Sequence, residues 1–323
     1  MFKKIMKGLT VATLLTTAGI SAPSYAAQDI LIGSTSASSS HYGYFVAVSK
    51  LLNDKVPDMK SSVAETGATL DNLRRLMRNQ VDIGLVTTNT LFEANAGIGG
   101  FENRQVDSKL LWIYALAPQN VVVRADSEVQ SLEQLKGQSF NPGIRGSSTE
   151  ATSEKVFELL SIKPEMVRGS TSDIVSAIKD NRVTGYVKSG AGLKLDASSQ
   201  DIAAQTPINL LGLNESQIAL LKEKLPQLSI VSVPENTSLS LTAYTTWGFG
   251  VGASAKPSLD EELAYQIVKA VMEDTEYQST AMASIKGQNL AEMTLQYATS
   301  PLHPATVRYL TEKGYDVPAS LKP

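Results

Sequence analysis

The sequence predicts an α/β protein with an open, largely parallel sheet that is divided into two lobes. Short apolar segments alternate with segments whose apolar residues recur at helical spacing. About 297 residues remain once a leader is removed, which is more than one hydrophobic core usually serves. The chain has no repeats, low-complexity tracts or long linker, so crossing strands are expected to join the lobes.

The first third of the chain carries the alternation most clearly. Residues 30–32 form a short apolar run, and residues 42–56 have apolar side chains at helical spacing. The pair of patterns then repeats, predicting strands over 60–65 and 81–86 and helices over 69–79 and 88–96. Strands connected by helices pair in parallel through right-handed crossovers, so this rhythm predicts the open sheet.

The rest of the chain is less regular. Two extended segments, residues 110–117 and 121–124, are predicted on either side of a break at Pro118-Gln119-Asn120. Helices are predicted over 149–160, 174–180, 259–274 and 304–313, a strand over 185–188, further elements over 208–211, 216–225 and 230–233, and extended chain through 247–251. We expect lobe 1 to comprise residues 27–116 and 245–323, and lobe 2 residues 117–244.

Residues 1–26 follow the plan of a secretory signal peptide. The first seven residues carry three lysines and no acid, and a mostly apolar stretch follows from Leu9 to Ile20. Ser24-Tyr25-Ala26 puts small residues where a signal peptidase reads them, and the apolar stretch is too short for an anchor. We expect cleavage after Ala26 and export to the periplasm of a Gram-negative bacterium, with the medium as the alternative.

Composition excludes several classes of protein. The absence of cysteine excludes an acylated lipoprotein and a disulfide scaffold. The formal charge is -3, and without the three leader lysines 26 basic residues face 32 scattered acids, so a nucleic-acid partner is not expected. No later segment approaches a membrane-spanning length, and the two histidines, His41 and His303, form no metal-ligand pattern. We therefore expect neither membrane insertion nor a metal or other cofactor.

Four loops rich in glycine, serine and threonine are the candidate binding site: residues 33–42, 66–69, 87–89 and 143–149. Each is expected at the C-terminal end of a strand, where a helix begins and ligands of open α/β sheets bind. Free backbone N–H groups at the positive end of a helix suit an anion. Serine and threonine are also the commonest N-caps, so one such loop alone would indicate only capping. Four at one edge of a sheet predict a site for a small anion.

Arg145 is the candidate cation of that site. Its guanidinium could grip a carboxylate through two hydrogen bonds, beside the helix start at residues 147–149. The alternative is a solvated loop arginine. Catalysis is not expected, because the chain has no Gly-x-Ser-x-Gly elbow and residues 143–149 lack the Gly-Lys-Ser/Thr of a phosphate-binding loop.

Five segments together resemble the TAXI solute receptors, the binding proteins of one branch of TRAP transporters. Residues 32–42 resemble the family's Ile-Gly-Thr-Gly-Ser-Thr-Gly-Gly-x-Tyr-Tyr segment, and 66–73 its Thr-Gly-Gly-Ser-x-x-Asn-Leu segment. Residues 82–86 read Asp-Ile-Gly-Leu-Val, 146–150 resemble Gly-Ser-Gly-Thr-Glu, and 303–309 resemble His-Pro-Gly-Ala-x-x-Tyr. No motif is specific alone, but the five occur in order across nearly the whole mature chain.

The resemblance implies a two-lobed periplasmic binding protein of type II fold, with its ligand between the lobes. It implies a small acid as ligand, a dicarboxylate such as 2-oxoglutarate or a glutamate-like acid, delivered to TRAP membrane permease subunits. Position by position it implies a site at Ser36, Tyr42, Thr66, Thr69, Asn72, Ser147 and Thr149, to which the loop analysis adds Arg145 and Ser148. We expect a monomer.

The chain departs from the family at three points. Ser38-Ser39 replace a glycine pair, His41 replaces a tyrosine, and Arg145 stands where proline is frequent. The added cation favours an anionic ligand. Two alternatives stay open: the same fold serving an ABC importer or a sensor, and an exported hydrolase that uses a loop serine with His41.

Overall fold

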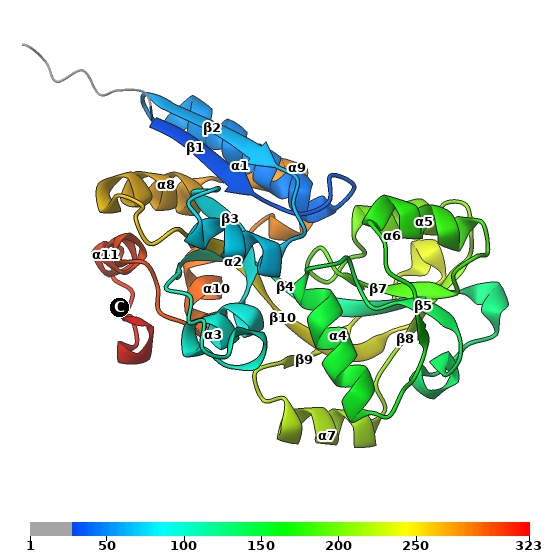
Figure 1. Cartoon of the computed structure of the whole chain (residues 1–323). Coiled ribbons are helices and arrows are strands. Elements are labelled where there is room, and N and C mark those ends of the chain that lie inside the picture. Colours follow the sequence, from blue (N-terminus) through cyan, green and yellow to red (C-terminus); the bar gives the residue numbers. More distant parts are fainter. Residues whose placement is uncertain (1–27) are drawn as a thin grey trace, which may run out of the picture.

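The computed structural model describes residues 28–323, so the predicted signal peptide lies outside the described residues. Two groups of elements are joined by two long strands, β4 (Lys109–Arg124) and β10 (Tyr244–Ala255) (Figure 1). The strands follow the order β2-β1-β3-β10-β4-β7-β5-β6, with β8 beside β4 and β9 beside β10. β10 pairs with β3 of one group and with β9 of the other, while β4 pairs with β10 and with β7 and β8, so the two strands connect the lobes without a tether.

Lobe 1 contains the first three strands of the described chain, which pair in parallel. Its strands β1 (Gln28–Gly33), β2 (Met59–Ala64) and β3 (Ile83–Thr87) are followed or connected by α1 (Ser40–Lys55), α2 (Thr69–Met77) and α3 (Thr88–Ala96). β3 is buried at every position, as expected of a parallel strand covered on both faces. The chain returns to this lobe with α8 (Glu261–Glu273), α9 (Tyr277–Ala281), α10 (Leu290–Tyr297) and α11 (Pro304–Glu312).

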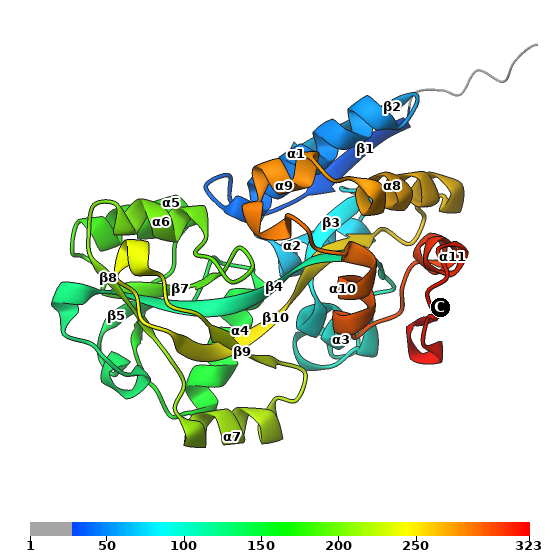
Figure 2. The same cartoon turned by 180° about the vertical axis from the view of Figure 1, so that it is seen from behind.

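Lobe 2 lies between the two crossing strands in sequence (Figure 2). Its strands are β5 (Ser139–Asn141), β6 (Glu165–Met166), β7 (Gly185–Ser189), β8 (Ile208–Leu211) and β9 (Ser229–Val233). Its helices are α4 (Ser148–Leu159), α5 (Thr171–Lys179), α6 (Ala197–Ala203) and α7 (Glu215–Lys224). Each helix begins after a Ser, Asp or Asn whose side chain accepts a bond from the first turn, as helix N-caps do.

The predicted break at Pro118-Gln119-Asn120 is wrong, because β4 is one continuous strand. Pro118 is the last β4 residue in register with β10, and Gln119 is the first in register with β7. The missing N–H of proline therefore falls where the strand changes partners, and extended backbone suits its fixed φ. The carbonyl of Pro118 still accepts a bond from the Gly190 N–H at 2.8 Å. The expected lobe boundaries near residues 117 and 244 fall inside β4 and at the start of β10, and stay a prediction.

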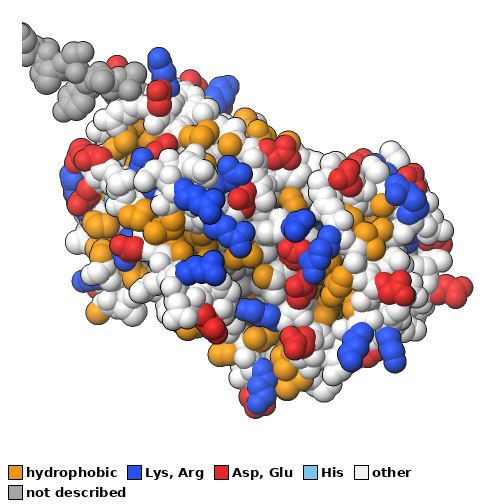
Figure 3. Space-filling model, in the orientation of Figure 1, with side chains coloured by type: hydrophobic (Ala, Val, Ile, Leu, Met, Phe, Trp, Pro, Cys, Tyr) orange, Lys and Arg blue, Asp and Glu red, His pale blue; other side chains and the backbone are white. Residues whose placement is uncertain are grey.

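A shared apolar core supports both crossing strands. Trp112 of β4 and Trp247 of β10 are completely buried, and Tyr44 of α1 stacks on Tyr114 of β4 with ring centroids 3.7 Å apart. On the surface, Lys and Arg side chains gather over α2 on one face, while both signs are interspersed elsewhere on it (Figure 3). Among residues 28–323, no helix combines the length and apolar character that crossing a membrane requires.

Candidate ligand-binding site

A cavity of about 40 Å³ lies between the lobes, where the four loops singled out from the sequence meet. Its polar lining comprises Thr35, Ser39 and His41 from the first loop, Thr69 from the second, Thr87 from the third, Ser147, Ser148 and Thr149 from the fourth, and Lys188 and Ser189 from β7. The loops meet because β1 and β3 run parallel and end at the same edge of the sheet.

Two sets of contacts close the cavity. We call the first the α1 seam: Ser39, Ser40 and His41 of lobe 1 bond to Gly190, Asp196 and Ala197 of lobe 2. We call the second the α4 seam: Leu70, Asn89 and Thr90 of lobe 1 bond to Gly146, Ser148 and Thr152 of lobe 2. With both seams formed, the two lobes are closed on each other.

The helices around the cavity begin in different ways. Ser147 caps α4 in the ordinary manner, accepting a bond from the Glu150 N–H at 3.1 Å. Thr87 precedes α3 but its side chain makes no cap bond, and Ala68, which precedes α2, has no side chain that could. The first turns of α2 and α3 therefore retain N–H groups that no cap side chain satisfies.

Two buried hydroxyl groups of the cavity wall have no hydrogen-bond partner among residues 28–323: those of Thr69 and Thr87. Their side chains are nearly inaccessible to solvent, at 1% and 4% exposure. A buried polar group without a partner costs about 1–3 kcal/mol. A molecule in the cavity is positioned to supply the missing partners.

Ala68 holds the backbone of this wall in a strained conformation. Its φ of 66° and ψ of -148° fall in a region that glycine enters freely and other residues rarely adopt. It stands at the second glycine of the family's Thr-Gly-Gly-Ser segment, so the strain, about 1–3 kcal/mol, is a feature of this chain. Such strain occurs at ligand sites, where the surrounding structure determines the backbone.

Lys188 supplies a cation to the cavity and is the only lysine or arginine among the described residues that line it. It lies on β7, and its Nζ is 3.6 Å from Oδ1 of Asp196, with the two side chains 9% and 0% exposed. Burial opposes the Asp196 charge, but Lys188, His41 and the bonds from Ser198 outweigh it and lower the pKa of this carboxyl below its usual value. The Asp196 carboxyl is therefore ionised at neutral pH.

His41 is neutral and fully engaged. Because a carbonyl oxygen only accepts, Nε2 carries the proton and donates to Gly190 O at 3.1 Å, while Nδ1 accepts from the Tyr114 hydroxyl at 3.0 Å. Burial is the main reason that the pKa of His41 falls to about 4. Neither ring nitrogen is left to act as a base for a loop serine, which argues against the hydrolase alternative.

Four of the residues singled out from the sequence line the cavity: Thr69, Ser147, Ser148 and Thr149. Thr149 is held by the crossing strand, because its Oγ1 donates to Gln119 Oε1 at 2.8 Å. Ser148 belongs to the α4 seam through Thr90, 2.6 Å away. Their contact with a ligand stays a prediction.

The other five, Ser36, Tyr42, Thr66, Asn72 and Arg145, do not line it. Asn72 and Thr66 lie behind the wall, where Asn72 Nδ2 donates to the carbonyls of Ser34 and Leu85 at 2.8 and 2.9 Å. A Cβ on Gly33 would come within 2.7 Å of Asn72 Oδ1, so glycine is required there. Asn72 and Thr66 therefore position the loops.

Ser36 bonds to Ser38, Tyr42 is half-buried in the first turn of α1, and the side chain of Arg145 is exposed. Lys188 supplies a cation to the closed cavity, and contact of Arg145 with a ligand stays a prediction. Sequence reasoning missed Lys188, and it included Thr87 only as part of the loop 87–89. The available signal was a lysine at the C-terminal end of the apolar strand 185–187, where ligands of α/β sheets bind.

A larger hollow of about 850 Å³ lies on lobe 1 between α1 and α8. It is an open surface groove that contains none of the predicted residues, and several of its acids are already paired, such as Glu273 with Lys313 and Glu262 with Arg308. No side chain of this groove is buried without a partner among the described residues. Within residues 28–323, no three His, Asp or Glu side chains gather as a metal ion would require. The cavity between the lobes is therefore the candidate site.

Two α/β lobes, two crossing strands and a cavity ringed by helix N-termini define a binding protein of the periplasmic type II fold. Similar solved structures include a putative L-cystine ABC transporter protein of Listeria monocytogenes (13% identity, 81% of this chain and 99% of that one, TM-score 0.53). Another, described for glutathione import by Streptococcus mutans, has 12% identity over 81% of this chain and 96% of that one, with a TM-score of 0.50. A TRAP periplasmic binding protein of Sulfitobacter with bound β-D-galacturonate has 11% identity, 90% and 88% coverage, and a TM-score of 0.49.

The chain belongs to the NMT1-like family, whose model matches residues 32–314. This is the family of TAXI-type TRAP solute-binding proteins, so the resemblance read from the five segments is confirmed. The protein is an extracytoplasmic solute-binding receptor, and its family binds solutes without acting on them chemically.

Proposed function

We propose that this receptor captures a small organic acid in the cavity between the lobes. The ligand is a dicarboxylate such as 2-oxoglutarate or a glutamate-like acid. The receptor works as a monomer in the periplasm and delivers the acid to the membrane permease subunits of a TRAP transporter.

One observation carries the proposal: the cavity combines a buried ammonium with two buried hydroxyls that have no partner within residues 28–323. A carboxylate beside Lys188 gains charge-assisted hydrogen bonds, each worth about 1.5–3 kcal/mol. The uncapped starts of α2 and α3, with Thr69 and Thr87, offer donors for a second carboxylate. The basic side chains over α2 would raise the rate at which an anion arrives (Figure 3).

A ligand screen on the mature protein, residues 27–323, tests this proposal. We expect 2-oxoglutarate or glutamate to raise the melting temperature, because a ligand that binds only the folded state stabilises it by mass action. Glutamine is the matched control, since it differs from glutamate by one uncharged group. Calorimetry that found glutamine bound as tightly as glutamate, or no carboxylate bound at all, would contradict the proposal.

Lys188→Met tests the role of the buried cation. We expect binding of the acid found in the screen to weaken about tenfold or more, because a charge-assisted bond of about 1.5–3 kcal/mol is lost. Lys194→Met is the control, since Lys194 is exposed in the loop that follows β7 and does not line the cavity. An unchanged dissociation constant for Lys188→Met would remove the lysine from the site.

A further inference from the structure

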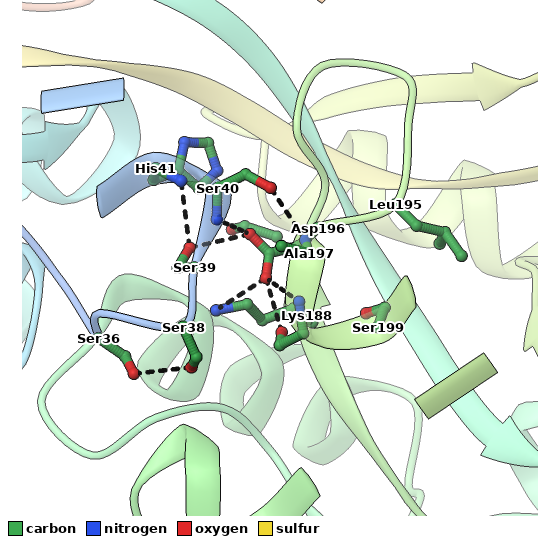
Figure 4. A network of polar contacts seen from close by, with 12 residues as sticks. Ser36, Ser38, Ser39, Ser40, His41, Lys188, Leu195, Asp196, Ala197 and Ser199 are labelled. Atoms are coloured by element: carbon green, nitrogen blue, oxygen red, sulfur yellow. Dashed lines mark hydrogen bonds and ion pairs between the residues drawn. The ribbon is translucent and has the colours of Figure 1, made fainter. Parts of the chain in front are cut away.

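Asp196 is completely buried between the lobes but does not line the cavity. It precedes α6 and caps that helix, because its Oδ1 accepts from the N–H and the hydroxyl of Ser198 at 3.0 and 2.6 Å. Its Oδ2 accepts from the Ser39 hydroxyl at 2.9 Å and the Ser40 N–H at 2.8 Å, at the start of α1 in lobe 1 (Figure 4). One carboxylate thus bonds to the N-termini of two helices from different lobes.

The contact is reciprocal. The hydroxyl of Ser40 accepts a bond from the Ala197 N–H at 2.9 Å, so lobe 1 returns a bond to the start of α6 (Figure 4). Beside it, His41 donates to the carbonyl of Gly190. Gly192 of the same segment lies against lobe 1, since a Cβ there would be 2.9 Å from Cβ of Ser284. Residues 188–197 therefore form the part of lobe 2 that holds α1.

The charges explain why an acid is needed at this position. Two helix N-termini face each other here, each with partial positive charge, and the Lys188 ammonium lies 3.6 Å from the carboxylate. Without a negative group they would repel one another on closing. Burying the Asp196 carboxylate costs several kcal/mol, and only a complete set of donors offsets that cost. The donors of Ser39 and Ser40 are present only when the lobes are closed.

We propose that Asp196 is a positioning residue that latches α1 to lobe 2 and directs Lys188 at the cavity. Through the latch it sets how long a ligand is held. The latch requires only the two lobes of the fold, whereas the role of Lys188 rests on the proposed function.

The latch can be measured without any ligand. The chain has no cysteine, so spin labels can be attached to Met77→Cys on lobe 1 and Arg182→Cys on lobe 2, both exposed positions. Distance distributions by pulsed electron resonance then give the ratio of closed to open protein. We expect Asp196→Asn, an isosteric change, to lower this ratio about tenfold, because both seam bonds lose their charge assistance.

Asp201→Asn is the matched control, because Asp201 lies on the same helix and pairs with Lys179 at the surface. We expect its distance distribution to match that of the unaltered protein. Identical distributions for Asp196→Asn and the unaltered protein would overturn the latch. If Asp196→Asn fails to fold, Ser40→Ala, which keeps the charge but removes the reciprocal bond, must lower the ratio about threefold. An unchanged ratio of closed to open protein in Ser40→Ala would also overturn the proposal.

Kinetics with a ligand from the screen test the second half of the proposal. We expect Asp196→Asn to raise the dissociation rate constant about tenfold and leave the association rate constant within about twofold. A change confined to association would overturn the assignment of Asp196 to holding the ligand. If no acid binds, the proposed function fails, and the distance measurement still decides the latch.

Discussion

The two seams that close this receptor differ in their chemistry. The α1 seam is built on a buried carboxylate, a buried ammonium 3.6 Å away and a neutral histidine. The buried part of the α4 seam is built on neutral groups: Thr90 against Ser148 at 2.6 Å, Asn89 to Thr152 at 2.9 Å, and the Leu70 N–H to the Gly146 carbonyl at 3.1 Å. The charged pair that joins the lobes beside it, Lys155 with Glu93, is partly exposed.

Closure therefore depends on one seam that responds to solution conditions and on one that does not. Neutral hydrogen bonds contribute about 1 kcal/mol each and do not respond to pH. A buried charge stabilises only when every partner is in place and correctly protonated. A change of pH should therefore weaken the α1 seam more than the α4 seam. The following experiments separate the contributions of the two seams.

Acidification should give the largest effect. The pKa of His41 is about 4 in the folded protein and near 6.5 unfolded, so below pH 6.5 the unfolded chain takes up a proton that buried His41 does not. The contribution of His41 to the free energy of unfolding is therefore complete above pH 6.5. It is lost, by about 3 kcal/mol, as the pH drops to about 4. Urea unfolding between pH 4.5 and 8 measures this fall.

His41→Gln isolates the histidine from other titrating groups, because glutamine keeps a donor and an acceptor but does not titrate. We expect the pH profile of this variant to be flatter. The pKa of Asp196 is lowered, so its own contribution is present above the ordinary pKa of 3.8 and is lost only below that window. Superimposable profiles for the two proteins would refute the role of His41.

Removing one partner of the α4 seam should have a smaller, pH-independent effect. Ser148→Ala leaves the buried Thr90 hydroxyl without its 2.6 Å partner, so we expect the free energy of unfolding to fall by about 1 kcal/mol. The fall should be equal at pH 5 and pH 8. In the double variant with Thr90→Val, no orphaned hydroxyl remains, and the loss should be less than the sum of the single losses. Strict additivity would argue against a direct bond.

The exposed ion pair should contribute least. Lys155 Nζ lies 2.7 Å from Glu93 Oε1, but the lysine side chain is 41% exposed and solvent screens the attraction. We expect Glu93→Gln to lower the unfolding free energy by about 0.5 kcal/mol or less, and the difference to vanish in about 1 M salt. A loss as large as that of Ser148→Ala, persisting at high salt, would show that the α4 seam also depends on charge.

Much of the fold was predictable because its signals are local. The helix over 88–96 was predicted at the bounds of α3, and the N-cap role of a loop serine was found at Ser147. Helix α6 was not predicted, because Ala197–Ala203 is short and has little apolar periodicity. Its start is stabilised by the Asp196 cap and by Ser40 of the other lobe, a contact that no local pattern carries.

Local sequence patterns sufficed for the class of this protein, for much of its order of strands and helices and for the four loops at one edge of the sheet, because these depend on residues adjacent in the chain. Tertiary structure alone decided which of those side chains face the cavity. Arg145 and Lys188 are both cations beside the predicted site, yet one is exposed and the other buried against Asp196. Burial depends on how two lobes meet, and that arrangement joins residues more than 150 positions apart, as the bond between Ser40 and Asp196 does.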